Sequence, residues 1–148
     1  MRRNFRFSPM PNLHHSCAAL RIGGDWLKPD EISRTLGCRP TLSFVKGQTE
    51  PSRGKALVRE TGGWHLDAVE QQPGNLDSHV AELFGRVNND LSAWATLSGE
   101  YRIDLFCVYF VGEVDEAVQA SAETLKVLGD RGVRLGLRIY SPAKESDI

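Results

Sequence analysis

The chain has 148 residues, of which 41% are hydrophobic and 25% charged, values that fit one globular domain and exclude a disordered segment. Its 18 basic and 19 acidic residues leave a formal net charge of -1, so it lacks the basic excess expected of a nucleic-acid-binding protein. The longest apolar run, Leu105–Val111, is too short for a membrane-spanning helix. Three cysteines, an odd number, indicate reduced thiols and a cytoplasmic protein. We expect neither a nucleic-acid nor a membrane partner.

The beginning of the chain contains two prolines, at positions 9 and 11, and shows no hydrophobic period. A strand with one apolar face follows over residues 17–22, because apolar side chains recur at every second position. The sequence therefore predicts a poorly ordered arm over residues 1–16, a single domain over residues 17–141, and a tail over residues 142–148.

A two-turn helix is expected next, between Lys28 and Gly37. Pro29 suits the first helical position, Asp30 and Glu31 suit the positive end of the helix dipole, and Gly37 can adopt the left-handed conformation that ends a helix. Residues 38–47 then read as a strand, and residues 48–56 have the composition of an exposed loop. Residues 57–68 read as a hairpin that turns at Thr61-Gly62-Gly63.

The clearest helix has a continuous apolar stripe and can be capped by Asn75 or Asp77. The stripe consists of Leu76, Val80, Leu83, Phe84 and Val87. A short helical turn around Leu91 and Trp94 is expected after it, before Gly99. The strand over residues 101–111 is the most apolar, so we place it at the centre of the sheet.

A second capped helix is predicted over residues 121–129. Ser121 is its cap, Leu125 and Leu128 point inward, and Gly129 ends it. The alternating strand over residues 133–140 closes the domain.

Together these elements predict an α+β fold. The first strand, helix and strand match the last strand, helix and strand, which suggests a ferredoxin-like sandwich built from two βαβ-type units. In this arrangement the sheet is mostly antiparallel, helices cover one face, and the hairpin is an addition. The other face remains for solvent, a ligand or a second copy of the chain.

Several short motifs carry a resemblance over about residues 17–140. They are LRIGGD, PDEI followed by LGCRPT, VKG, GGW and the closing GLRIY. In their order and spacing they resemble the bacterial domain-of-unknown-function family 4279. The chain departs from that pattern in the N-terminal arm and at Lys28. The resemblance implies a small cytoplasmic domain of bacterial type, and it brings no catalytic residue.

The neighbouring His14, His15 and Cys17 raise the question of a metal site. Structural metal sites are usually anchored by close pairs such as C-x-x-C or H-x-x-x-H, and the chain has neither. We interpret this stretch as a polar lead into the first strand, and the three cysteines as small buried hydrophobic residues. We predict no metal and no cofactor. No serine stands in a Gly-x-Ser-x-Gly elbow either, so no catalytic residue is assigned.

A basic, aromatic-edged set of residues is the candidate site for a ligand or partner. It consists of Arg21, Lys46, Trp64, His65, Arg134 and Arg138. In the predicted strand phases the arginines face away from the helices, where they could hold an anionic ligand or an acidic surface. The alternative is that Trp64 is a core residue, packed against the long helix near Val80 or Phe84, and that the arginines are simply solvated.

Two classes of function remain open. The first is a non-catalytic binding or interaction module, immunity-like or regulatory, that uses the open sheet face for a protein partner. The second is a small enzyme or binding protein for an anionic metabolite, with His65 as acid or base. The absence of a convergent nucleophile or cofactor motif favours the first. Because Phe106, Val108 and Phe110 project from the open face, we also predict a homodimer, unless the hairpin covers them.

Overall fold

The computed structural model describes residues 15–71, 75–110 and 117–140. The predicted tail and most of the predicted arm lie outside these residues. The first strand begins at His15, so residues 15 and 16, which we assigned to the arm, belong to the sheet.

The described residues form four helices and seven strands. The helices are α1 (Pro29–Leu36), α2 (Leu76–Phe84), α3 (Leu91–Glu100) and α4 (Ala122–Asp130). The strands are β1 (His15–Gly24), β2 (Leu42–Phe44), β3 (Thr49–Ser52), β4 (Lys55–Val58), β5 (Gly62–Asp67), β6 (Arg102–Phe110) and β7 (Arg134–Tyr140).

One five-stranded sheet has the order β2-β5-β1-β6-β7, and β3 and β4 form a separate hairpin. All neighbouring strands are antiparallel except β6 and β7, which are parallel. The protein is therefore an α+β fold with a mixed sheet.

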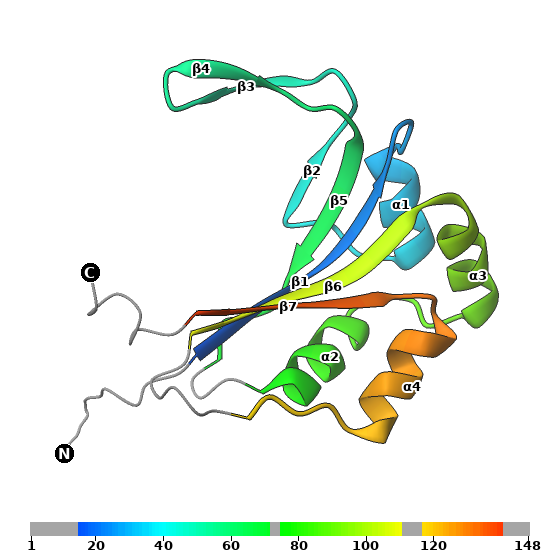
Figure 1. Cartoon of the computed structure of the whole chain (residues 1–148). Coiled ribbons are helices and arrows are strands. Elements are labelled where there is room, and N and C mark those ends of the chain that lie inside the picture. Colours follow the sequence, from blue (N-terminus) through cyan, green and yellow to red (C-terminus); the bar gives the residue numbers. More distant parts are fainter. Residues whose placement is uncertain (1–14, 72–74, 111–116, 141–148) are drawn as a thin grey trace, which may run out of the picture.

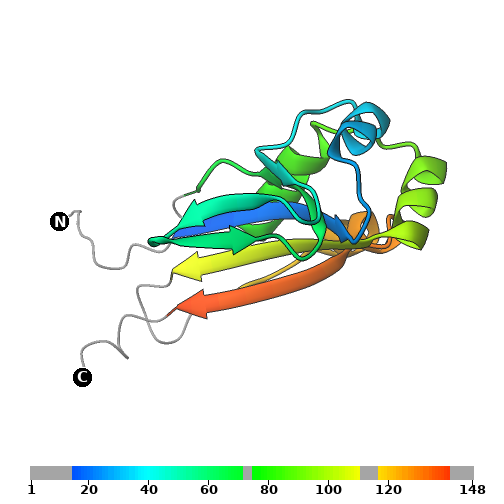
Figure 2. The same ribbon diagram turned by 90° about the horizontal axis from the view of Figure 1, so that it is seen from above.

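The sheet has a covered face and an open face. Figure 1 shows the four helices on one side of the sheet and the β3–β4 hairpin projecting from the other side. Figure 2 shows the helix and sheet layers from above. None of the described helices is long and apolar enough to cross a membrane.

The alternation expected for the strands is confirmed in β1 and β6. Every second residue of each strand is buried beneath the helices, and these are Ala18, Leu20 and Ile22 in β1 and Ile103, Leu105, Cys107 and Tyr109 in β6. Their neighbours in sequence consequently lie on the open face. The position of β6 differs from our prediction, because β1 is the middle strand and β6 lies between β1 and β7.

Helix α1 follows its local sequence signals. Pro29 occupies the first turn, and Gly37 ends the helix with a left-handed φ of 66°. Lys28 makes no side-chain capping hydrogen bond. Ile32 and Leu36 are buried and form the apolar side of the helix.

The hairpin was predicted at the wrong residues. The turn lies at Arg53-Gly54, whose φ values of 50° and 77° are the positive pair that a tight hairpin turn needs. Residues 48–56, which we read as a loop, therefore contribute to both hairpin strands. Strand β5 pairs instead with β1 and β2 in the main sheet.

Two helix predictions also need correction. Helix α3 is a ten-residue helix capped by Asp90, longer than the short turn we expected. In α4, Leu125 is 54% exposed and Thr124 is buried in its place, where its hydroxyl donates to an Asp77 oxygen at 2.6 Å. Helix α4 continues past Gly129 to Asp130, and the positive φ of 68° occurs at Gly132.

The two strand-helix-strand units are not equivalent. Strands β1 and β2 are separated by β5, whereas β6 and β7 are direct parallel neighbours. The similarity of the two sequence stretches therefore reflects the same local order of elements and not the same pairing of strands.

Candidate functional site

A row of polar side chains crosses the open face of the sheet. Arg21 of β1 stands opposite His65 of β5 on one side and Asp104 of β6 on the other, and Asp104 is beside Arg134 of β7. Residues paired in this way project to the same face of a sheet. The register thus gathers the four side chains, which come from widely separated parts of the sequence.

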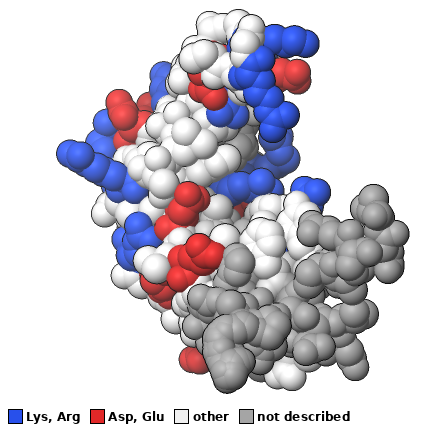
Figure 3. Space-filling view, turned by 90° about the vertical axis from the view of Figure 1, so that its left-hand side faces the viewer, with Lys and Arg blue, Asp and Glu red and all other residues white. Residues whose placement is uncertain are grey.

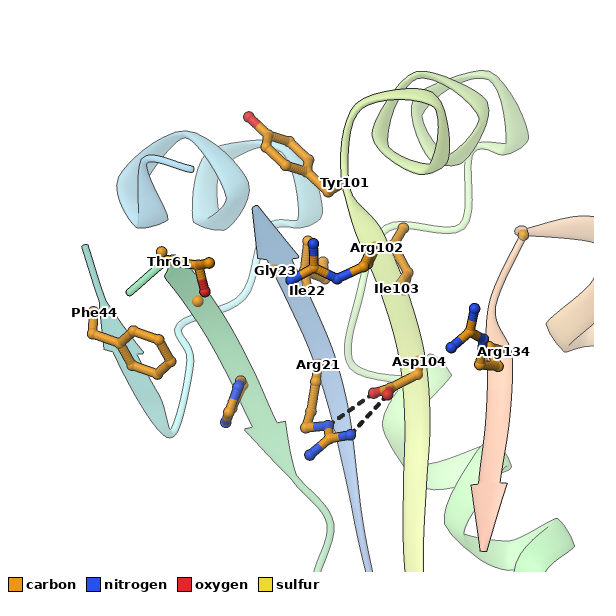
Figure 4. Close-up of a pocket in the computed structure, with 14 residues that line it drawn as sticks. Arg21, Ile22, Gly23, Phe44, Thr61, Tyr101, Arg102, Ile103, Asp104 and Arg134 are labelled. Atoms are coloured by element: carbon orange, nitrogen blue, oxygen red, sulfur yellow. Dashed lines mark hydrogen bonds and ion pairs between the residues drawn. The ribbon is translucent and has the colours of Figure 1, made fainter. Parts of the chain in front are cut away.

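A pocket of about 390 Å³ lies along this row, and all four residues line it. This volume is within the range typical of small-molecule sites. The side chains that give it chemical character are Arg21, Phe44, His65, Tyr101, Arg102 and Arg134. Figure 4 shows that they come from several adjacent strands and from the rim above them.

Arg21 is already engaged within the protein. Its Nε and one Nη donate to the two carboxylate oxygens of Asp104 at 2.8 and 2.7 Å, drawn as dashed lines in Figure 4. The hydrogen bond to Asp104 raises the pKa of Arg21, and the guanidinium also lies 4.5 Å from the centre of the Phe106 ring. A bidentate pair holds both side chains in position, so Arg21 lines the pocket in a fixed orientation.

Arg102 and Arg134 differ from Arg21 because neither makes an ion pair or side-chain hydrogen bond within the described residues. Three arginines and one aspartate line the pocket, which leaves a net formal charge of +2. Figure 3 shows basic side chains gathered on the hairpin and below it on this side of the molecule. The pocket therefore offers two cationic groups to an anion.

Glycines allow side chains to lie close to the sheet in this pocket. A Cβ at Gly63 would overlap the Phe44 ring, and one at Gly23 would lie 3.5 Å from an Arg102 nitrogen. The guanidinium of Arg59 lies 4.0 Å from the centre of the Phe44 ring and pairs with Glu50 of β3 at 2.6 Å. This stack joins the base of the hairpin to the sheet and closes one side of the pocket.

His65 contributes a polar ring to the pocket. Its pKa is lowered chiefly by partial burial and also by the nearby charge of Arg21. The ring meets Phe44 edge-on, with centroids 5.5 Å apart, and makes no hydrogen bond within the described part of the chain. The lowered pKa favours the neutral imidazole, which has one nitrogen that donates a hydrogen bond and one that accepts.

The structure separates the six residues proposed from the sequence. Arg21, His65 and Arg134 line the pocket. Arg138 lies farther along β7 on the same face, 5.1 Å from the centre of the Tyr140 ring. The orientation predicted for the three arginines is confirmed by the register of the strands.

The other two candidates lie outside the pocket. Trp64 is fully buried on the helix-covered face, and its indole nitrogen donates to the Ser33 hydroxyl of α1 at 3.0 Å. Its burial confirms the core position of our alternative interpretation, while packing of the ring near Val80 or Phe84 stays a prediction. Lys46 contacts Asp25 at 3.6 Å and lies 4.8 Å from the centre of the exposed Trp26 ring. It therefore links two loops.

Sequence reasoning missed Phe44, Tyr101 and Arg102. A signal for Arg102 existed, because it is two residues before Asp104 and so shares its face in a strand. No comparable signal identified Phe44, since its place over Gly63 depends on the pairing of β2 with β5.

The structure describes only part of the histidine- and cysteine-containing stretch at the start of β1. His14 lies outside the described residues, and no group of three or more potential metal ligands occurs within them. Cys107 is buried, and burial raises its pKa to about 12. Cys17 and Cys38 are partly exposed, so the expectation that all three thiols are buried is wrong for these two.

Comparison with known proteins identifies a family. The family model described as Domain of unknown function (DUF4279) matches residues 12–142. Nothing among the curated proteins and nothing among the solved structures matches the chain. Since the family model covers most of the sequence and includes every pocket residue, the chain belongs to the DUF4279 family.

Proposed function

We propose that this domain is a non-catalytic binding module that recognises an anionic group in the pocket on the open face of its sheet. The observation that carries the proposal is that the guanidinium groups of Arg102 and Arg134 line the pocket and make no ion pair or side-chain hydrogen bond to the part of the chain that the structure describes, whereas Arg21 is paired with Asp104. Arginine presents planar donors that match carboxylate and phosphate oxygens. The partner that supplies the anion can be a protein, as in an immunity-like or regulatory module.

The arrangement of possible nucleophiles supports binding over catalysis. Ser16 and His79 are hydrogen-bonded, with their Oγ and Nε2 atoms 2.6 Å apart. Both residues are completely buried on the covered side of the sheet. A substrate in the pocket cannot reach this pair, so it serves packing and not nucleophilic attack.

Thermal unfolding with added inorganic phosphate tests the proposal, with sodium chloride at equal ionic strength as the reference. A ligand at about 100 times its Kd stabilises the folded state by about 2.7 kcal/mol, which corresponds to a rise in Tm of several degrees. We expect this rise in the parent protein and its loss in an Arg102→Gln, Arg134→Gln double variant. Arg138→Gln is the matched control. An equal rise in the double variant would contradict the proposal.

One observation favours a second candidate, an enzyme that acts on an anionic metabolite. The lowered pKa of His65 leaves its imidazole unprotonated near neutral pH, the state required of a general base. This candidate predicts that the parent protein converts a bound anion to product. The His65→Asn variant should lose this turnover and still bind the anion. Binding without turnover selects the non-catalytic module.

We also propose a ferredoxin-like core for the sheet strands β2, β5, β1 and β6. The support is that β1 and β2 are parallel and flank β5, while β5 and β6 are parallel and flank β1. Helix α4 and β7 are then an extension at the β6 edge. An experimental structure with right-handed β1-α1-β2 and β5-α2-α3-β6 crossovers would support the assignment, and a left-handed crossover would contradict it.

A further inference from the structure

We infer that the anion recognised by this pocket is a phosphomonoester group of a small molecule, held by Arg102 and Arg134 with His65 as a third hydrogen-bonding partner. The inference rests on the proposed function and specifies the chemistry of its ligand. It follows from the number of donors, from their positions on the sheet and from the charge of the pocket.

The donors come from three different strands. His65 lies on β5, Arg102 on β6 and Arg134 on β7, and all three line the pocket. Arg134 pairs in register with Asp104, so Arg102, two residues away on β6, is its diagonal neighbour. Diagonal neighbours are on the order of 7 to 8 Å apart, within reach of long side chains. The two guanidinium groups can therefore approach one anion from different directions.

The geometry of the anion follows from this arrangement. A carboxylate has two oxygens in one plane, and one arginine can occupy both, as Arg21 does with Asp104. About two lone-pair sites then remain, and they lie in the same plane, so a second and third donor would have to approach within that plane. A phosphoryl group presents three terminal oxygens that point in different directions, so two guanidinium groups and an imidazole can each take one.

The charge of the pocket supports the same ligand. Arg21, Arg102 and Arg134 against Asp104 leave a formal charge of +2. A phosphomonoester carries about -1.5 to -2 charges at pH 7, which nearly neutralises this excess, whereas a carboxylate or sulfonate carries only one negative charge. The volume of about 390 Å³ leaves room for a small organic part next to the phosphoryl group.

The pKa of His65 gives a second way to detect the ligand, in addition to its affinity. In the absence of ligand, this pKa depends on burial of the ring and on nearby charged groups. The charged groups that act on its ring are Arg21 on β1, Arg59 before β5, Asp67 on β5 and Asp104 on β6. A dianion bound beside the ring favours the imidazolium form. The pKa of His65 should then rise when the ligand binds to the folded protein. Unfolding would also raise this pKa, because it removes the burial that lowers it, so the rise is read only where circular dichroism shows that the fold is retained.

The test is calorimetric titration of the full chain with three aromatic anions that share a phenyl ring: phenyl phosphate, benzenesulfonate and benzoate. We expect phenyl phosphate to bind at least about tenfold more tightly than either monoanion, a difference of about 1.4 kcal/mol. Arg102→Gln and Arg134→Gln should each remove this preference, while Arg138→Gln, on the same face outside the pocket, should retain it. NMR titration of the His65 ring protons should show a higher pKa with phenyl phosphate.

Three outcomes would overturn the inference in distinguishable ways. Equal affinity for the three anions, still dependent on Arg102 and Arg134, would refute the phosphomonoester and leave the anion-binding function intact. Binding of none of the anions would refute the proposed function as well. Equal weakening by Arg138→Gln would show that general positive charge, and not the pocket, attracts the ligand. Circular dichroism of each variant establishes that it is folded.

Discussion

Replacement of Trp64 by alanine should remove one of the largest contributions to the stability of this domain. The side chain is 0% exposed, and its indole nitrogen makes a 3.0 Å hydrogen bond to Ser33. Truncation of a buried tryptophan to alanine costs about 3 to 5 kcal/mol, and the Ser33 hydroxyl also loses its partner. A domain of ordinary stability has only about 5 to 15 kcal/mol in total.

Trp26 offers a matched control, because the same substitution removes the same side chain from a position that is 77% exposed. Its contact with Lys46 is an exposed cation–π interaction, worth about 0.5 to 1 kcal/mol. Urea unfolding measures both variants. With a slope of about 2 kcal/mol per molar urea, Trp64→Ala should lower the midpoint by about 2 M, and Trp26→Ala by less than about 0.5 M. Equal shifts in the two variants would refute the placement of Trp64.

Three further predictions concern the core and the open face. Burial lowers the pKa of His79, so protonation of this side chain is less favourable in the folded state than in the unfolded state. The free energy of unfolding should therefore be full above about pH 6.5 and fall as the pH drops through the folded pKa. Urea unfolding at several pH values should show a smaller fall for His79→Gln. Gly63→Ala places a methyl group against the Phe44 ring and should lower the free energy of unfolding by about 1 to 3 kcal/mol. Gly99→Ala adds a methyl group in a helix with open space around it and should raise the free energy of unfolding by about 1 kcal/mol in the same assay. If the apolar part of the open face around Phe110 joins two copies, sedimentation should give a dimer, and a monomer at all concentrations would contradict this.

The parts of the fold that were predicted correctly depend on local signals. Helix α1 is specified by Pro29 at its start and Gly37 at its end, and both act through their own backbone geometry. The alternation of β1 likewise needs only its own residues. These elements could be read without knowledge of their partners.

The misplaced hairpin shows where local reading fails. Arg53-Gly54 and Gly62-Gly63 both resemble turn signals, and the sequence does not rank them. The structure uses Gly62 and Gly63 for close packing: a Cβ at Gly62 would lie 2.8 Å from the Leu27 carbonyl oxygen, and one at Gly63 would overlap a phenyl ring. A glycine can be required because a distant residue packs closely against it, or because the chain turns there. The sequence alone does not distinguish these two cases.

The sequence predicted the face of the sheet that carries the candidate site, but not which residues form it. The strand period placed Arg21, Arg134 and Arg138 on the open face. The register then decides their roles, because it joins Arg21 to Asp104 across 83 positions in sequence. It also places Arg102 in the lining of the pocket and leaves Arg138 outside. Such long-range pairing is not encoded in any local pattern.

The most direct test of the central claim, that the pocket binds an anionic group, is a phosphate titration of the ¹⁵N-labelled protein followed by amide NMR. Glycine amides report on both regions. Gly23, Gly63 and Gly132 line the pocket, whereas Gly85 is the C-cap of α2 and Gly99 lies in α3, two helices on the covered side. We predict saturable shifts at the three pocket glycines and none at the other two. Shifts of equal size at all five, or no saturable shift at the pocket glycines, would contradict the account.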